Sequence, residues 1–368
     1  SNTTTESVTA DVSVFVGSSA PAVGAVVEKS SVEIPQQDSV DLRLADLTDG
    51  GPVVSIAVEV VDSGGVMVDK IVSGPTGVAR SACSTDGSGS WVVPSGSTAP
   101  GARHQLVLFN PFPDDAIVDV DFVADAGSRE PEDLTALHVP ARSSRLVEIG
   151  DFVAAAGTVS TFVEARSGRV VVEAIQSFDG SADPLGLGLI AGVPAPAETW
   201  TFAGVAPRTG PARLVAINPS DTIVRADVEI YPAGAERFIE PLQLTMRPGQ
   251  HAVVDLLADG RLEGIPSFTV VVRSFDGPRL VVGLEQRPPE PETGPLAELL
   301  ETEAPATGFA GSAGQALESV SLMTTIDVAE GDLTSALHLF NPSDDTFVTV
   351  EALVLGEGAS RPVTLEVG

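Results

Sequence analysis

The sequence repeats itself with a period of about 108 residues, and this repeat constrains the fold more than any other feature. Asn110 and Asn218 stand 108 residues apart, and Trp91 and Trp200 stand 109 apart. A degraded copy opens the chain, where Asn2 precedes Asn218 by two periods. The motif that carries Asn occupies residues 104–126, 213–234 and 336–358. Several landmarks that agree to within a residue predict a tandem array of like units.

Each copy of the motif predicts a strand, a turn and a second strand. Val118, Val120 and Phe122 share one face of the second strand and Asp119 and Asp121 the other, a period of two that is typical of a half-buried strand. The Asn-Pro pair ends the first strand, because proline has no N–H to donate and disfavours helix in the residue before it.

A full unit contains about seven short strands with turn signals every 8 to 12 residues, which predicts an all-β fold of tandem immunoglobulin-like β-sandwich repeats. Between the third and fourth copies lies a proline-rich, acidic stretch in which Leu296–Glu301 forms a predicted short helix. The predicted organisation is an incomplete sandwich at 1–87, sandwiches at 88–198 and 199–287, a linker at 288–308 and the first half of a further sandwich at 309–368.

The end units are incomplete by this alignment. The first lacks its opening strands, so we expect open sheet edges near Val8–Phe15 and Ser31–Ile34. Ser319–Phe340 carries strands of the missing type. Three alternatives follow: the native chain extends beyond both ends, the C-terminal segment folds back onto the N-terminal unit, or it pairs head to tail with another molecule.

Composition excludes several classes of partner. The formal charge is −31, from 20 basic and 51 acidic residues, and such a field repels nucleic-acid phosphates and anionic membrane surfaces. Solubility explains this acidity, with calcium binding at Asp-rich turns as the sharper alternative. No run of 18 apolar residues is present, so we expect no membrane insertion. The start at Ser1 has no initiator Met and no signal-peptide pattern, and we expect that any targeting segment has been removed.

An ordered set of motifs supports a resemblance to a known family. It consists of Cys83, Trp91-Val92-Val93, a Gly/Ser loop, Leu106–Pro111, Asp115–Val118 and Ser167–Val171. The set resembles a family of uncharacterised secreted actinobacterial proteins, defined only as a domain of unknown function. The resemblance implies an extracytoplasmic envelope protein, with some members encoded near glycosyltransferases. Members often carry a second cysteine just after the tryptophan. Val92 or Val93 stands there in this chain, which implies that the disulfide is lost and Cys83 is its orphan.

The chain offers few residues with chemistry. No two of the four histidines, His104, His138, His251 and His338, lie at metal-ligand spacing, and we interpret them as solvated strand-edge residues. No Gly-x-Ser-x-Gly elbow is present, although a Ser/His/Asp triad built from distant loops stays open. The glycines of Gly186–Val193 lack the lysine of a phosphate loop and predict a strand instead.

Three further groups have a structural and a functional interpretation. Trp91 and Trp200 are core residues or, if exposed, carbohydrate platforms. The asparagines and acids of the repeated turn either satisfy turn backbone or bind a ligand such as calcium; they are Asn110, Asn218, Asn341, Asp114, Asp115, Asp221, Asp344 and Asp345. Cys83 lies in a loop whose nearest cation along the sequence is Arg80, too little to predict a reactive thiol. We predict no catalytic, cofactor-binding or metal-binding residues.

These observations predict a non-enzymatic structural or scaffold protein, extracellular or on the cell surface. Its partners would be other envelope proteins or itself, through sheet edges. The alternative is a binding module for a cell-envelope glycan or an accessory subunit of a polysaccharide-synthesis complex, which a cluster of exposed aromatics would favour. A hydrolase is the third hypothesis, which a conjunction of His with Ser and Asp would favour.

Overall fold

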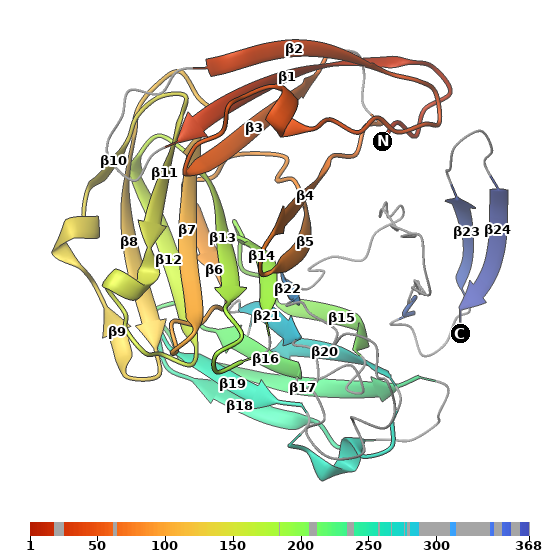
Figure 1. Cartoon of the computed structure of the whole chain (residues 1–368). Helices are drawn as coiled ribbons and strands as arrows, with labels where there is room; N and C mark the ends of the chain where they lie inside the picture. The colour runs from red at the N-terminus through yellow and green to blue at the C-terminus, as the bar shows by residue number, and fades with distance from the viewer. Residues whose placement is uncertain are drawn as a thin grey trace, which may run out of the picture.

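The fold is all-β, and the computed structural model shows it as several small antiparallel sheets (Figure 1). The structure describes residues 1–17, 26–61, 65–183, 185–205, 212–233, 239–256, 258–265, 267–275, 277, 280–286, 310–313, 339–341, 348–354 and 361–367. Within these ranges helical structure is limited to 3-10 turns of three residues, such as Glu132–Leu134. The predicted helix Leu296–Glu301 and residues 288–308 as a whole lie outside the described residues.

Two sheets enclose the first complete core. One has the order β10-β8-β12-β6, with β9 added to β8, and the other has the order β11-β7-β13-β14. Side chains from both sheets fill one cluster around Trp91, Phe122 and Phe178. The strands are β6 (Ser90–Val93), β7 (Ala102–Asn110), β8 (Ala116–Ala124), β9 (Gly127–Arg129), β10 (Leu137–Val139), β11 (Ser143–Glu148), β12 (Val159–Ser167), β13 (Val171–Phe178) and β14 (Gly186–Ala191).

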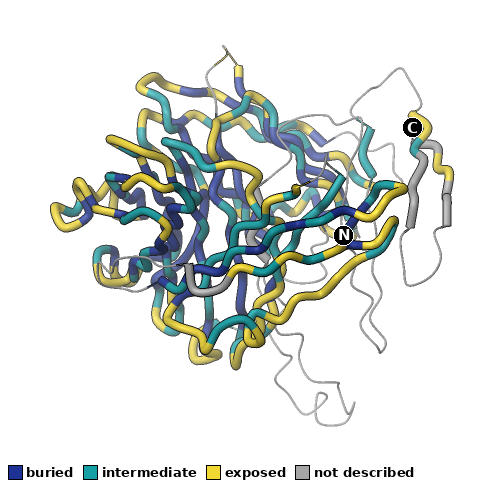
Figure 2. Tube along the Cα trace, turned by 90° about the horizontal axis from the view of Figure 1, so that it is seen from above, coloured by how far each residue is buried: buried dark blue, intermediate teal, exposed yellow. Residues whose placement is uncertain are grey.

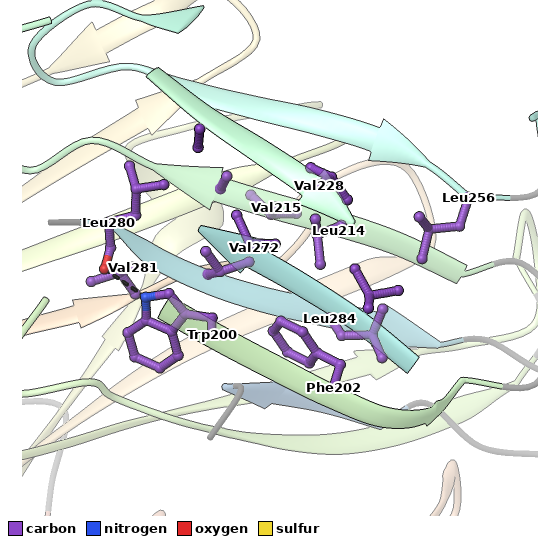
Figure 3. Packing of buried hydrophobic residues seen from close by; sticks show 14 of the residues in the cluster. Trp200, Phe202, Leu214, Val215, Val228, Leu256, Val272, Leu280, Val281 and Leu284 are labelled. Atoms are coloured by element: carbon purple, nitrogen blue, oxygen red, sulfur yellow. Dashed lines mark hydrogen bonds between the residues drawn. The ribbon is translucent and has the colours of Figure 1, made fainter. Parts of the chain in front are cut away.

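The next pair of sheets repeats this strand order. The orders β18-β17-β20-β15 and β19-β16-β21-β22 follow the first pair strand for strand, and their side chains share a second cluster around Trp200 and Phe202 (Figure 3). The strands are β15 (Thr199–Val205), β16 (Ala212–Ile217), β17 (Val224–Pro232), β18 (Leu242–Met246), β19 (His251–Asp255), β20 (Phe268–Ser274), β21 (Val281–Gln286) and β22 (Ala310–Ala313).

The alternation seen in the sequence correctly predicts the core. In β8, Val118, Val120 and Phe122 are at most 1% exposed, while Asp119 and Asp121 are partly exposed on the other face. The residues predicted to be buried on β16 and β17 are also at most 1% exposed; they are Leu214, Ala216, Val224, Ala226 and Val228. Figure 2 shows buried residues running through the sheets and exposed ones gathering at the turns.

Strand β22 lies where the linear repeat did not place it. The sequence assigns residues 309–313 to the last unit, whereas Ala310–Ala313 pairs with β21 from Gly283 to Gln286 and completes a four-stranded sheet. In the first core, β14 pairs with the outer side of β13. The equivalent side of β21 is paired with β22, which follows residues 288–308 in the sequence.

The N-terminal region forms a three-stranded sheet and a separate hairpin. The sheet has the order β2-β1-β3, from β1 (Val8–Gly17), β2 (Val26–Ile34) and β3 (Val53–Val60), and the hairpin joins β4 (Asp69–Gly74) to β5 (Gly77–Ala82). The predicted open edge at Val8–Phe15 is wrong, because β1 pairs with β2 on one side and with β3 on the other. Ser31–Ile34 does lie on β2, an outer strand of this sheet.

The N-terminal sheet rests on the side of the first complete core. The rings of Phe15 and Phe109 lie 5.1 Å apart between centroids, and Ser144 Oγ donates to Ser55 Oγ at 2.6 Å. The last strands, β23 (Val348–Val354) and β24 (Arg361–Val367), form a hairpin apart from the main body (Figure 1).

Candidate functional site

A serine, a histidine and an aspartate from distant parts of the chain meet between the two complete cores. Ser160 lies near the start of β12, His251 begins β19 and Asp125 follows β8 in a turn. Ser160 Oγ lies 3.1 Å from His251 Nδ1, and His251 Nε2 lies 3.9 Å from Asp125 Oδ1. This is the conjunction that would favour a hydrolase. Whether Ser160 can act as a nucleophile depends on where the protons of Ser160 and His251 lie.

The proton of Ser160 points away from the imidazole. Ser160 Oγ donates to the carbonyl of Pro94 at 2.8 Å, which leaves an Oγ lone pair to accept from His251 Nδ1–H. Burial lowers the pKa of His251, with Asp125 opposing the effect, so the ring is neutral at neutral pH. A neutral ring that donates through Nδ1 presents a lone pair at Nε2 toward the Asp125 carboxylate. In a nucleophilic triad the serine donates to the base and the aspartate accepts from its other N–H. Here the serine accepts from the ring instead, and Nε2 has no proton to donate to Asp125.

Burial also sets Ser160 apart from an enzyme nucleophile. Its exposed fraction is 0%, and the His251 side chain is 9% exposed. A nucleophilic serine needs space beside its Oγ for the substrate atom that it attacks and for the donors that stabilise the oxyanion. The Oγ of Ser160 instead lies between Pro94 O and His251 Nδ1. The arrangement therefore ties the start of β19 to β12 and to the residue that follows β6, across the junction of the two cores.

His104 is a second buried histidine, and its predicted solvated position is wrong. It lies on β7, a central strand, and is 1% exposed. Neither ring nitrogen makes a well-aligned hydrogen bond within the described residues, and the nearest polar group is the backbone of Ile175, which opposes the effect of burial on the ring. Gly96 packs flat against the ring, since a Cβ on this glycine would lie 2.1 Å from His104 Nε2. Burial lowers the pKa of His104 to about 4, so the neutral ring is the form that the core accepts.

The other histidines separate into two cases. His138 is exposed on the outer strand β10 as predicted, and its Nε2 lies 2.7 Å from Asp115 Oδ2. Hydrogen bonds from the backbone of Ala141 and from His138 lower the pKa of Asp115. His251 lies on the outer strand β19, as predicted, but the first core covers it. The sequence of one unit alone does not reveal this contact with the neighbouring unit. His338 lies outside the described residues.

Asn2, Asn110 and Asn218 hold the repeated turn, which confirms the structural interpretation. Each is 0% exposed. Each Nδ2 donates to the carbonyl four residues on and to a carbonyl that ends another strand, and each Oδ1 accepts from the backbone N–H two residues on. For Asn218 these partners are Thr222 O at 2.7 Å, Met246 O at 3.2 Å and Ser220 N at 2.9 Å.

Replacing Asn218 by alanine is expected to lower the free energy of unfolding by about 2 kcal/mol, because two buried carbonyls and one N–H lose their partner. Urea unfolding followed by tryptophan fluorescence measures it. Asp221→Ala, at an exposed position of the same turn, is the matched control. Equal stability of the Asn218→Ala and Asp221→Ala variants would contradict the anchoring role.

No metal centre is built at these turns within the described ranges: no group of three or more His, Cys, Asp or Glu there is placed to hold an ion. Asp115 is engaged with Ala141 N and His138, and Asp221 is exposed. Asp344 and Asp345 lie outside the described residues. The side-chain amides of Asn110 and Asn218 are hydrogen-bonded to backbone groups, so this turn offers few free ligand atoms.

The remaining candidates have structural roles. Trp91 and Trp200 are each 2% exposed, which confirms them as core and excludes the sugar-platform alternative. Their indole N–H groups donate to Val170 O and Leu280 O, both at 2.8 Å. Burial raises the pKa of the Cys83 thiol, with Lys70 as an opposing charge, which favours the protonated thiol. Val92 and Val93, the positions at which the resemblance implied a second cysteine, are buried.

Comparison with known families gives one match. Residues 72–263, more than half of the 368, match the model of a family of unknown function, DUF5719. The chain belongs to this family. The DUF5719 match covers the whole first core and the junction that holds Ser160, His251 and Asp125. No curated protein and no solved structure matches the chain. Within the described residues, no helix of this DUF5719 member is long and apolar enough to cross a membrane.

Sequence reasoning missed the junction of Ser160, His251 and Asp125. Ser160 and His251 are 91 residues apart, and nothing in the local pattern of either residue marks a partner. One signal was present: His251 replaces the small Ser144 at the corresponding place of the earlier unit, and such a departure within a repeat marks a unit-specific contact.

Proposed function

We propose that this protein is a non-enzymatic structural or scaffold protein, extracellular or attached to the cell envelope, built from tandem immunoglobulin-like sandwiches. The repeated strand order of the two complete cores is the observation that carries the proposal. Turn anchors Asn110 and Asn218 and core anchors Trp91 and Trp200 recur with the same hydrogen bonds. The recurring asparagines and tryptophans thus stabilise the fold of each unit, which supports a structural role.

The junction between units supports a fixed spacing. Val92 pairs with Val193 through mutual backbone hydrogen bonds of 2.9 and 2.8 Å, and both side chains belong to the core of the following unit. Ser160 and His251 add a polar contact across the same junction. The apolar packing of these side chains and the Ser160–His251 contact together oppose rotation of one unit against the next, which suits a spacer or scaffold.

The net charge of −31 and the sheet edges suggest how such a scaffold meets partners. Like charges keep copies apart except where a specific contact outweighs the repulsion. Sheet edges provide that contact through backbone hydrogen bonds. We propose other envelope proteins, or further copies of this chain, as the partners.

Affinity capture from the native envelope after mild crosslinking tests the scaffold proposal. The expected result is recovery of the chain in the secreted or envelope fraction together with envelope proteins or copies of itself. Recovery in the cytosolic fraction alone would contradict the proposal. An exposed-charge variant, Glu59→Ala, serves as a check that capture does not depend on a single surface acid.

Labelling with a fluorophosphonate probe distinguishes the scaffold from a hydrolase. Ser160 is expected to stay unlabelled in the folded chain, because its hydroxyl is buried and donates to Pro94 O. Intact-protein mass spectrometry of wild type and Ser160→Ala measures the adduct. An adduct on wild type that Ser160→Ala loses would replace the scaffold proposal with a serine hydrolase.

A further inference from the structure

Two pairs of side chains join the N-terminal sheet to the first complete core, where β1, β2 and β3 rest against β7 and β11 (Figure 1). The Phe15 ring lies 5.1 Å from the Phe109 ring, and Ser144 Oγ donates to Ser55 Oγ at 2.6 Å. Ser55 pairs with Phe15 in the ladder of β3 and β1, and Ser144 pairs with Phe109 in the ladder of β11 and β7. An apolar pair and a polar pair therefore lie side by side at this junction.

The turn asparagines define the same two positions in the other units. One position lies 13 residues after the asparagine, and we call it the receiving position; its occupants are Phe15, Val123 and Tyr231. The other lies directly before the asparagine of the next unit, and we call it the docking position; its occupants are Phe109, Ile217 and Phe340. The occupants differ in size, but all six are apolar or aromatic.

The junction of the two complete cores uses these same positions. Val123 and Ile217 are buried there, and the residues that pair with them in their own sheets are Ser160 and His251. Ser160 and His251 make the 3.1 Å contact across the junction. This contact is therefore the counterpart of the serine pair at the first junction, with an imidazole in place of one hydroxyl.

The receiving and docking positions meet again beyond the second core. Tyr231 occupies the receiving position on β17, and Phe340 occupies the docking position before Asn341. Their rings lie 5.1 Å apart between centroids with planes inclined by 52°, against 5.1 Å and 56° for Phe15 and Phe109. The two ring pairs therefore have closely similar geometry at corresponding positions.

The outward face of β20 is covered, although it does not belong to the second core. Side chains of a strand alternate between its faces, and Val270 and Val272 point into the core. Thr269 and Val271 therefore point outward, yet they are only 9% and 3% exposed. Thr269 pairs with Tyr231 and so holds the place of the hydroxyls at the earlier junctions. Burial of an outward face requires a neighbour that covers it.

Val271 has a counterpart that lies in a junction. It pairs with Glu229 as Phe162 pairs with Asp121, and these two acids stand at the same distance from the asparagine of their unit. Phe162 packs against the core of the following unit. Val271 is buried without being a member of the core cluster of its own unit. A following unit seated on β17 and β20 accounts for this burial.

We propose that the outward face of β17 and β20 is the docking face for the next unit of this same chain, the unit that contains Phe340, β23 and β24. The inference deepens the proposed scaffold function and rests on it. Each unit then receives its successor on one sheet and docks on its predecessor with the other, so the array continues with the same contact from unit to unit. The apolar pair supplies burial, and the adjacent polar pair fixes the lateral position, since a shifted unit would leave a buried hydroxyl without its partner.

Thiol accessibility in the full chain tests the docking face. All chains carry Cys83→Ser and Val271→Cys, and mass spectrometry follows the reaction of the introduced thiol with a maleimide. The thiol is expected to react slowly, because Val271 is 3% exposed. Adding Phe340→Asp should raise the rate by about tenfold or more, because a carboxylate replaces the ring that packs on Tyr231 and the docked unit opens more often. Val348→Asp, at an exposed site on β23, is the matched control and should leave the rate unchanged.

Two further measurements separate the outcomes. Tryptophan fluorescence should be unchanged by Phe340→Asp, which shows that the second core around Trp200 stays folded while its outward face opens. The rate of the chain without Phe340→Asp should not depend on protein concentration, because the covering unit belongs to the same molecule.

Equal rates for Phe340→Asp and Val348→Asp would overturn the docking face. Protection that increases with protein concentration would assign the cover to a second copy and would overturn the proposed occupant. Either failure leaves the scaffold function to stand or fall on envelope capture, which does not depend on the contact of Phe340 with Tyr231.

Discussion

Replacing Trp200 by alanine is expected to lower the free energy of unfolding of its unit by about 3–5 kcal/mol, the largest effect of any single change considered for this chain. The ring is 2% exposed and packs within the second core (Figure 3). Its loss removes apolar burial and leaves a cavity. It also removes the indole N–H that donates to Leu280 O at 2.8 Å, a buried carbonyl.

Urea unfolding measures this effect, and the chain offers its own internal reporter. Trp91 and Trp200 are the two tryptophans, so in Trp200→Ala the remaining fluorescence reports the first core. Trp200→Phe is the matched control, because it keeps a ring and loses mainly the N–H. Its expected cost is smaller, of order 1–2 kcal/mol. An unchanged midpoint for Trp200→Ala would show that the ring is not a core anchor.

Iodide quenching gives an independent check on the folded chain. Both rings should be protected until urea unfolds the chain, because each is 2% exposed. Free access of iodide to both rings in the native state would contradict their burial and would reopen the sugar-platform alternative.

Acid is expected to destabilise the first core through His104. Burial lowers its pKa to about 4 from an ordinary value of 6.5. As pH falls below 6.5 the unfolded chain binds a proton that the folded chain refuses, so stability present above pH 6.5 is lost progressively down to about pH 4. The shift corresponds to a loss of about 3 kcal/mol across that window.

The measurement is the pH dependence of the unfolding free energy of three chains. His104→Gln has no titrating ring at this position and should show a flatter curve between pH 6.5 and 4 than wild type. Ile223→Gln, at an exposed position without a titrating group, should keep the wild-type slope. If wild type and His104→Gln lose stability in parallel, His104 does not control the acid response.

The sequence by itself determined the local structure of this protein. The period-two alternation in β8 predicted the buried face of Val118, Val120 and Phe122, because side chains of a strand alternate regardless of its neighbours. Asn110 and Asn218 recur at a spacing within one residue of that of Trp91 and Trp200, and their roles follow from turn chemistry and side-chain size. Strand alternation, turn residues and large apolar side chains each depend on a few neighbouring residues, so one sequence is sufficient to predict them.

Tertiary structure alone decided the lateral order of strands and the contacts between units. His104 and β1 were expected at edges and lie on central strands, since the alternation of one strand does not reveal how many neighbours it has. Residues 310–313 complete a sheet from across a linker, and Ser160 meets His251 over 91 residues. Such contacts depend on which edges and faces remain open after each unit has folded, and that is a property of the assembled chain.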